Sequence, residues 1–215
     1  MRIYREKDYD AMSRRAANII SAEVIRRPDC VLGLATGSTP IGTYKQLAAW
    51  NQRGDFSFKE VHSVNLDEYK GLSGDHDQSY RYFMDTNLFD HINIDKKNTF
   101  VASGMGDFEA NARELEEKVR EGGAADLQLL GIGNNGHIAF NEASDHLIAV
   151  AHTEKLTEST INANARFFEK KEDVPTMAIT MGMGDILAAK KVVLAATGLA
   201  KVPAIRGLIM DDVIT

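Results

Sequence analysis

Hydrophobic positions along the chain alternate between two spacings, which predict helices and strands in turn. The first segment has apolar residues three or four positions apart, on one face of a helix that ends near Pro28: Met12, Ala16, Ile19, Ile20 and Val24. The short apolar run Cys30–Ala35 then predicts a strand. In the turn after it, Ser38 or Thr39 is expected to cap the next helix, with Pro40 at the first helical position.

The same alternation continues to the end of the chain. Further strands are predicted at 61–66, 99–102, 126–131, 149–156, 176–180 and 192–196. Further helices are predicted at 80–89, 108–120, 159–168, 184–189 and 201–209. This order predicts an α/β protein with a Rossmann-like, open, mostly parallel sheet and helices on both faces. No repeat, low-complexity segment or long linker divides the chain, so we expect a single domain over residues 1–215.

Three loops follow predicted strands, where ligands bind in open parallel sheets. The first, Gly33–Pro40, is rich in small residues that let backbone N–H groups approach an oxyanion at a helix N-terminus. It lacks the Gly-Lys-Ser/Thr end of a Walker A loop, so a nucleoside triphosphate is not indicated. An ordinary capped turn explains this segment equally well.

The second loop, Asn65–Tyr69, places Asp67 and Glu68 at the end of an apolar strand. Partial removal from water raises the pKa of a carboxyl group and makes the carboxylate a stronger base toward a weakly acidic C–H bond. Taken alone, the pair fits a polar loop better than a catalytic base.

The third loop, Gly131–Glu142, contains Gly-x-Gly-x-x-Gly. This pattern is weak evidence for a dinucleotide site, and Glu154 only roughly matches the acidic residue expected about 20 positions later. More informative are Asn135, His137 and Glu142, because a histidine can exchange protons with a substrate while an amide and a carboxylate fix its tautomer and orientation. Here a functional histidine is favoured over a structural one.

Composition and charge narrow the ligand classes. The 215 residues are 44% hydrophobic and 26% charged, as in an ordinary folded domain. With 25 Lys+Arg and 31 Asp+Glu, the net charge of −6 argues against non-specific binding of nucleic acid or of an anionic membrane. No signal peptide or membrane span is apparent, so we expect a cytoplasmic protein.

Single residues add further limits. The only cysteine, Cys30, excludes an intrachain disulfide and a cysteine-only metal cluster, and we expect it to be buried. The histidines other than His137 lack the spacing of metal ligands, so no metal site is expected. Arg166 and Lys201 are candidate phosphate partners, although their spacing alone fits solvated charges better.

These loops together resemble those of the glucosamine-6-phosphate deaminase family, over essentially the whole chain. Residues 34–40 are similar to the family's phosphate loop, residues 65–69 with 71–72 to its enolising segment, and residues 136–142 to its signature. Residues 163–168 and Lys201 also match.

The resemblance implies an enzyme of amino-sugar catabolism, a hydrolase acting on a carbon–nitrogen bond. Its substrate would be the sugar phosphate glucosamine 6-phosphate, converted with water to fructose 6-phosphate and ammonia through ring opening, isomerisation and loss of the amine. Neither a metal nor a redox cofactor is implied.

The resemblance also implies roles for individual residues. His137 would shuttle the ring-oxygen proton while Glu142 and Asn135 orient it, and Asp67 would remove the proton from C2. The phosphate would be held by the side chains of Arg166 and Lys201. Backbone N–H groups would complete its binding site, at Gly37, Ser38 and Thr39.

The chain departs from the family pattern in three places. Some members have aspartate at the position of Asn135, so His137 is expected to be less basic here. Larger members bind an allosteric N-acetylated sugar phosphate with basic residues where this chain has His152 and Glu154, which argues against that effector site but leaves the effector response open. The chain ends at Thr215, earlier than members usually do, which agrees with the loss of a terminal strand and helix.

Two alternatives to a deaminase differ from this chain in their sequence features. A 6-phosphogluconolactonase-type hydrolase usually has arginine after the Asp-Glu pair and Gly-His-Thr in its signature, where this chain has Tyr69 and Ile138. A non-catalytic sugar-phosphate sensor of a transcription regulator carries a DNA-binding module, which we do not expect before Met1. The sequence leaves open whether the protein is a monomer or a homo-oligomer.

Overall fold

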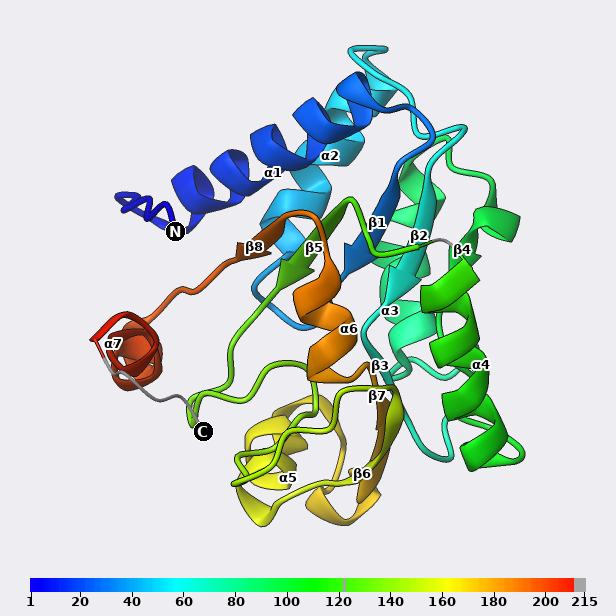
Figure 1. Ribbon diagram of the computed structural model, residues 1–215, viewed down its shortest axis with the longest axis vertical. Helices are drawn as coiled ribbons and strands as arrows, with labels where there is room; N and C mark the ends of the chain where they lie inside the picture. The colour runs from blue at the N-terminus through cyan, green and yellow to red at the C-terminus, as the bar shows by residue number, and fades with distance from the viewer. Residues whose placement is uncertain (122, 211–215) are drawn as a thin grey trace.

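A five-stranded parallel sheet forms the centre of the protein (Figure 1). The computed structural model describes residues 1–121 and 123–210, so the expectation about the chain's end at Thr215 concerns residues outside this range. The sheet has the order β4-β2-β1-β5-β8. Its strands are β1 (Val31–Leu34), β2 (His62–Asn65), β4 (Thr99–Phe100), β5 (Leu127–Leu130) and β8 (Val192–Leu194). The predicted α/β class with a mostly parallel central sheet is confirmed.

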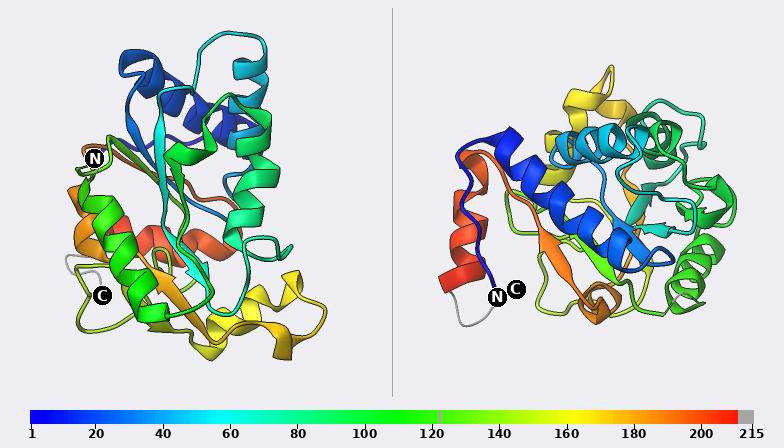
Figure 2. Two further views of the ribbon diagram at one scale, coloured as in Figure 1. Left: turned by 90° about the vertical axis from the view of Figure 1, so that its right-hand side faces the viewer. Right: turned by 90° about the horizontal axis from the view of Figure 1, so that it is seen from above.

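Helices cover both faces of this sheet (Figure 2). Right-handed crossovers place α2 and α3 on one face and α4 and α6 on the other, and α1 packs along α2. The α-helices are α1 (Tyr9–Arg26), α2 (Ile41–Gln52), α3 (Tyr80–Asn87), α4 (Phe108–Glu121), α5 (Glu158–Asn164), α6 (Met183–Ala188) and α7 (Val202–Met210). Short 3-10 helices are η1 (Phe89–His91), η2 (Lys96–Asn98), η3 (Ala165–Phe167), η4 (Lys171–Asp173) and η5 (Leu199–Lys201).

A second, smaller sheet was not predicted from the sequence. Its antiparallel strands are β3 (Asp67–Tyr69), β7 (Met177–Thr180) and β6 (His152–Lys155), in the order β3-β7-β6. Leu66 alone separates β2 from β3, and its backbone joins the two sheets. Its N–H donates to the Leu34 carbonyl at 3.3 Å, and its carbonyl accepts from Met181 at 2.7 Å. The segment at 61–66 therefore leads directly from one sheet into the other.

The main core lies between the parallel sheet and its helices. Cys30 is fully buried there, as expected, and burial raises the pKa of its thiol to about 12. Asp126, before β5, ties the edge of the core together. Its carboxylate accepts from the Val31 N–H at 2.9 Å and from the side chains of Arg27 and Lys190. None of the described helices is long and apolar enough to cross a membrane.

Candidate active site

The first candidate loop lies between β1 and α2 and presents unpaired backbone donors. The N–H groups of Gly37, Ser38 and Thr39 have no hydrogen-bond acceptor among the residues that the structure describes. Gly37 has a φ of 86°, a left-handed conformation that glycine adopts at low cost. The loop can therefore offer several N–H groups to one anion at the helix N-terminus.

The predicted capping of α2 by Ser38 or Thr39 is wrong. The helix begins at Ile41, and the residue at its cap position, Pro40, provides no side-chain acceptor. The Tyr9 hydroxyl accepts the Gly42 N–H at 2.8 Å instead. The Gly42 N–H, in the first turn of α2, thus finds its acceptor on α1 and not on a neighbouring residue of its own helix.

The second candidate loop places Asp67 at the junction of the two sheets. Its side chain is buried, and Oδ1 has no hydrogen-bond partner within the described part of the chain. Burial raises the pKa of Asp67 well above its usual value, and the neighbouring Glu68 raises it further. A carboxylate in this position is a strengthened base whose Oδ1 receives no hydrogen bond from the described residues.

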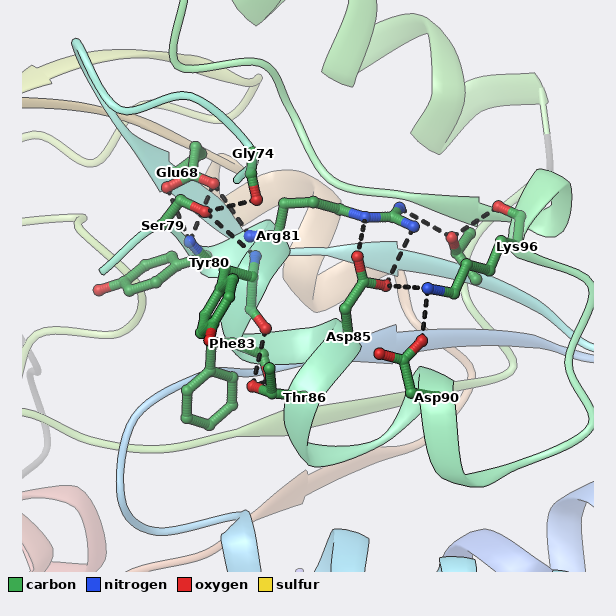
Figure 3. Close-up of polar contacts among 12 residues, drawn as sticks. Glu68, Gly74, Ser79, Tyr80, Arg81, Phe83, Asp85, Thr86, Asp90 and Lys96 are labelled. Atoms are coloured by element: carbon green, nitrogen blue, oxygen red, sulfur yellow. Dashed lines mark hydrogen bonds and ion pairs between the residues drawn. The ribbon is translucent and has the colours of Figure 1, made fainter. Parts of the chain in front are cut away.

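Glu68, its neighbour, has a structural role at the N-terminus of α3 (Figure 3). Its carboxylate accepts backbone N–H groups from Tyr69 at 2.8 Å, from Tyr80 at 2.9 and 3.0 Å and from Arg81 at 3.1 Å. Burial raises the pKa of Glu68 to about 7 against the effect of these donors. Because its oxygens are occupied, Asp67 is the member of the pair suited to proton transfer.

The third candidate loop is shaped around the ring of His137. A Cβ on Gly133 would lie 2.5 Å from Cε1 of this ring, so only glycine fits there. The Gly133 N–H donates to the His137 carbonyl at 2.8 Å. Ala139 has a φ of 54°, a conformation that costs a non-glycine residue roughly 1–2 kcal/mol. Strain of this kind is concentrated at functional sites.

The two carboxylate oxygens of Glu142 have different neighbours: one faces His137, and the other accepts hydrogen bonds from two threonines. Oε2 lies 3.7 Å from Nδ1 of His137 and 3.4 Å from Nδ2 of Asn135. Oε1 accepts from the backbone and hydroxyl of Thr157, at 3.2 and 3.1 Å, and from the hydroxyl of Thr160 at 2.5 Å. These bonds and the charge of His137 outweigh burial and lower the pKa of Glu142. The predicted trio is brought together.

Burial lowers the pKa of His137, because it disfavours the charged imidazolium. The negative charge of Glu142 opposes this effect, and the positive charge of Lys201 adds to it. His137 is therefore biased toward the neutral form that can accept a proton. Its Nδ1 has no hydrogen-bond partner among the described residues and lies 3.7 Å from Oε2 of Glu142.

The two candidate phosphate partners are linked to His137 by charge: Lys201 lowers the pKa of His137, and Arg166 lowers that of Lys201. Arg166 is exposed on η3, with its guanidinium 4.6 Å from the centre of the Phe167 ring. Lys201 is half-buried at the end of η5, where burial and the charge of Arg166 lower its pKa. Neither cation forms an ion pair with any carboxylate in the described ranges. Two like charges without a counter-ion suit an anionic ligand.

The base and the histidine loop share a neighbour, Thr180 of β7. Asp67 is paired with Thr180 in the antiparallel sheet, and the Phe140 N–H donates to the Thr180 hydroxyl at 3.1 Å. The Tyr69 ring contacts Phe140, with centroids 5.3 Å apart, and reaches Phe168, two residues beyond Arg166, at 6.0 Å. This packing links the second and third loops and the turn that carries Arg166.

Sequence reasoning missed the residues that support the site. Thr157 and Thr160 hold Glu142, and Tyr9 holds the first loop. Only Thr157 had a detectable signal, since a threonine before Glu158 is typical of a helix cap. Over residues 1–121 and 123–210, no group of three or more His, Cys, Asp or Glu side chains could hold a metal ion, so the absence of a metal stays a prediction.

Comparison with known proteins identifies similar sequences and folds. Residues 5–213 match the family model described as "Glucosamine-6-phosphate isomerases/6-phosphogluconolactonase". A protein of Clostridium perfringens (strain 13 / Type A) named glucosamine-6-phosphate deaminase is 50% identical over 100% of this chain and 89% of its own length. A relative of the same name from Lachnoclostridium phytofermentans is 56% identical, over 92% of this chain and 84% of its own.

Solved structures give the same picture. One described as a monomeric glucosamine-6-phosphate deaminase has a TM-score of 0.97 and 41% identity, over 100% of this chain and 89% of its own. The 6-phosphogluconolactonase of Thermotoga maritima has a TM-score of 0.76 at 20% identity, over 97% of this chain and 89% of its own. This second likeness concerns the fold alone.

Proposed function

This chain belongs to the glucosamine-6-phosphate isomerase/6-phosphogluconolactonase family, and on that basis we propose that it is a glucosamine-6-phosphate deaminase. The observation that carries the proposal is the Asp67 carboxyl group, which is buried, has a raised pKa and has an Oδ1 that no described residue bonds. A base of this kind suits removal of the weakly acidic proton at C2 of an aldose. His137 beside Glu142, and the cations Arg166 and Lys201, which form no ion pair with a described residue, complete the set.

The first step is opening of the sugar ring. His137 takes the proton of the C1 hydroxyl and returns it to the ring oxygen as the C1–O5 bond breaks, which leaves an aldehyde at C1. Glu142 stabilises the transient imidazolium, because it lies 3.7 Å from Nδ1. Neutral imidazole is the form required at the start, in agreement with the lowered pKa of His137.

The next steps move a proton and release the amine. Asp67 removes the proton from C2, and the electron pair forms a C1–C2 double bond as the aldehyde oxygen takes a proton from solvent, which regains one when the iminium is hydrolysed. Return of the proton to C1 gives an iminium at C2. Water adds at C2 and ammonia leaves, so that glucosamine 6-phosphate and water become fructose 6-phosphate and ammonia. In this scheme the enzyme acts as a hydrolase of a carbon–nitrogen bond after isomerisation.

The phosphate would bind at the first loop. We place it against the backbone N–H groups of Gly37, Ser38 and Thr39, with Arg166 and Lys201 as its charged partners. Anchoring at C6 keeps C2 within reach of Asp67, which converts part of the binding energy into correct orientation of the reacting carbon. We keep the cytoplasm as the proposed location, and monomer and homo-oligomer both remain open.

The experiment is release of ammonia and fructose 6-phosphate from glucosamine 6-phosphate, with a chelator present and nicotinamide cofactors omitted. We expect both products in equal amounts. Hydrolysis of 6-phosphogluconolactone without deamination would instead assign a lactonase. Binding of the sugar phosphate without turnover would assign a sensor.

A further inference from the structure

The hydroxyl of Tyr9 bridges two points of the first candidate loop. Tyr9 is the first residue of α1, yet its hydroxyl donates to the Ser38 carbonyl at 3.1 Å and accepts from the Gly42 N–H at 2.8 Å. A phenol has one proton to donate, so these two bonds use its donor and one acceptor position. Gly42 permits this contact, because a Cβ there would lie 2.9 Å from Cε1 of the Tyr9 ring.

The bond to Ser38 fixes the direction of a backbone donor. The described residues contain no cis peptide bond, and in a planar trans peptide the carbonyl of one residue points opposite to the N–H of the next. The Ser38 carbonyl is held toward α1, so the Thr39 N–H points away from α1. Like the N–H groups of Gly37 and Ser38, this N–H has no acceptor among the described residues.

A second tyrosine acts in the same way at the start of the loop. The hydroxyl of Tyr44, which is fully buried, donates to the Ala35 carbonyl at 2.5 Å. The Thr36 N–H must therefore point away from Tyr44. The loop is held at both ends by side chains of helices, and Tyr9 is the one partner of the exposed Ser38 carbonyl within the described part of the chain.

We propose that Tyr9 is a positioning residue for phosphate binding: its hydroxyl holds the Ser38–Thr39 peptide so that the loop presents its N–H groups to the phosphate of the substrate. This inference rests on the proposed function and deepens it by adding a residue that does not itself contact the sugar. The Tyr9 hydroxyl also accepts the Gly42 N–H, while the N–H groups of residues 37–39 have no acceptor among the described residues.

The test removes only the hydroxyl, in Tyr9→Phe. We expect KM for glucosamine 6-phosphate to rise about 3- to 10-fold, the effect of one hydrogen bond, while kcat changes less than about twofold. The dissociation constant of inorganic phosphate, measured by calorimetry, should rise by a similar factor. Tyr82→Phe is the matched control, because that hydroxyl lies on the exposed side of α3 and makes no hydrogen bond to a described residue.

The outcomes separate this inference from the proposed function. If Tyr9→Phe lowers only the melting temperature, with KM and the phosphate constant unchanged, the hydroxyl is merely structural and the inference is overturned. If the unaltered protein releases no ammonia but binds phosphate, and Tyr9→Phe weakens that binding, the positioning role stands and the deaminase proposal fails. If the unaltered protein binds neither phosphate nor substrate, both fail.

Gly42→Ala provides an independent variant that keeps the hydroxyl. The added Cβ would lie 2.9 Å from the Tyr9 ring and 2.4 Å from Oγ of Ser13, so the ring must shift. We expect KM to rise here as well, again with little change in kcat. Unchanged KM in a folded Gly42→Ala protein whose Tyr9 has moved would also count against the inference.

Discussion

At the scale of single residues, the unpaired oxygen of Asp67 determines what its replacement should do. Asn is nearly the same size but cannot accept a proton, so Asp67→Asn should reduce kcat by about 10²- to 10⁴-fold. Exchange of the C2 hydrogen with deuterated solvent should stop, while phosphate affinity stays unchanged. The measurement is proton NMR of the sugar in D₂O. Exchange at the original rate would remove Asp67 from the proposed role.

His137 should respond in opposite directions to two changes around it. Asn135→Asp adds a negative charge nearby and should raise the pKa of His137, moving the acidic limb of the kcat/KM profile to higher pH. Glu142→Gln removes the charge that now opposes burial, so the pKa should fall and the limb should move to lower pH. Profiles of kcat/KM against pH for the three proteins test this. Superimposable profiles would show that neither side chain sets the protonation of His137.

Arg166 offers a test of phosphate recognition. Loss of a charge-assisted hydrogen bond costs about 1.5–3 kcal/mol, so Arg166→Ala should raise KM roughly 10- to 100-fold and change kcat less. Steady-state kinetics provide the measurement. Lys170→Ala is the control, because Lys170 is exposed near the same turn and makes no ion pair with the described residues. Equal effects of the two variants would point to the overall charge rather than a binding residue.

At the scale of elements, hydrophobic spacing predicts where helices and strands lie, but it does not predict which strands pair with each other. The strands predicted at 149–156 and 176–180 exist, but they join a second sheet with β3. Spacing reports whether a strand is buried, whereas its partner depends on contacts distant in sequence, such as the bond from Met181 to Leu66.

The same distinction applies to the candidate site. Asp67 and His137 stood out because each lies in a distinctive local motif after a strand. Tyr9 could not be found in this way, because its partners are 29 and 33 residues away and depend on how α1 packs on α2. Thr160 is likewise 18 residues from the carboxylate that it holds.

The third candidate loop should tolerate added bulk at one glycine and not at another. In Gly133→Ala, the Cβ would overlap the His137 ring, so the ring must leave its place beside Glu142. We expect kcat to fall about tenfold or more, with little change in melting temperature, because the loop is partly exposed. Gly131→Ala is the matched control, since a Cβ there meets no atom within 4 Å. Equal activity of the two variants would contradict the described fit of the ring.

At the scale of the whole molecule, two carboxyl groups outside the site couple stability to pH. Asp185 of α6 and Glu116 of α4 interact, and Glu116 also accepts the Ala151 N–H at 2.8 Å and lies 2.6 Å from Arg120. Burial and Glu116 raise the pKa of Asp185 to about 7, above its value in the unfolded chain. The contribution of Asp185 to the free energy of unfolding is therefore fully present below about pH 4, and it is lost as the pH rises through 7.

Asp185→Asn should remove this dependence, because the amide does not ionise. Relative to the unaltered protein, the variant should gain unfolding free energy as the pH rises from 5 to 8. Urea unfolding at several pH values measures the difference. Asp29→Asn, at an exposed position, should show a difference that does not change with pH over this range. If the difference in unfolding free energy between Asp185→Asn and the unaltered protein also stays constant with pH, the carboxyl pair is not the source of the pH dependence.

Burial of Cys30 also makes the protein well suited to spectroscopic labelling. The sole thiol is enclosed by the core and remains protonated at neutral pH, so it will not compete for maleimide or iodoacetamide reagents. One cysteine introduced on an exposed surface would thus carry a fluorophore or spin label without first removing a native residue. Placed on the Arg166 turn, such a reporter would follow ligand arrival directly, independently of turnover.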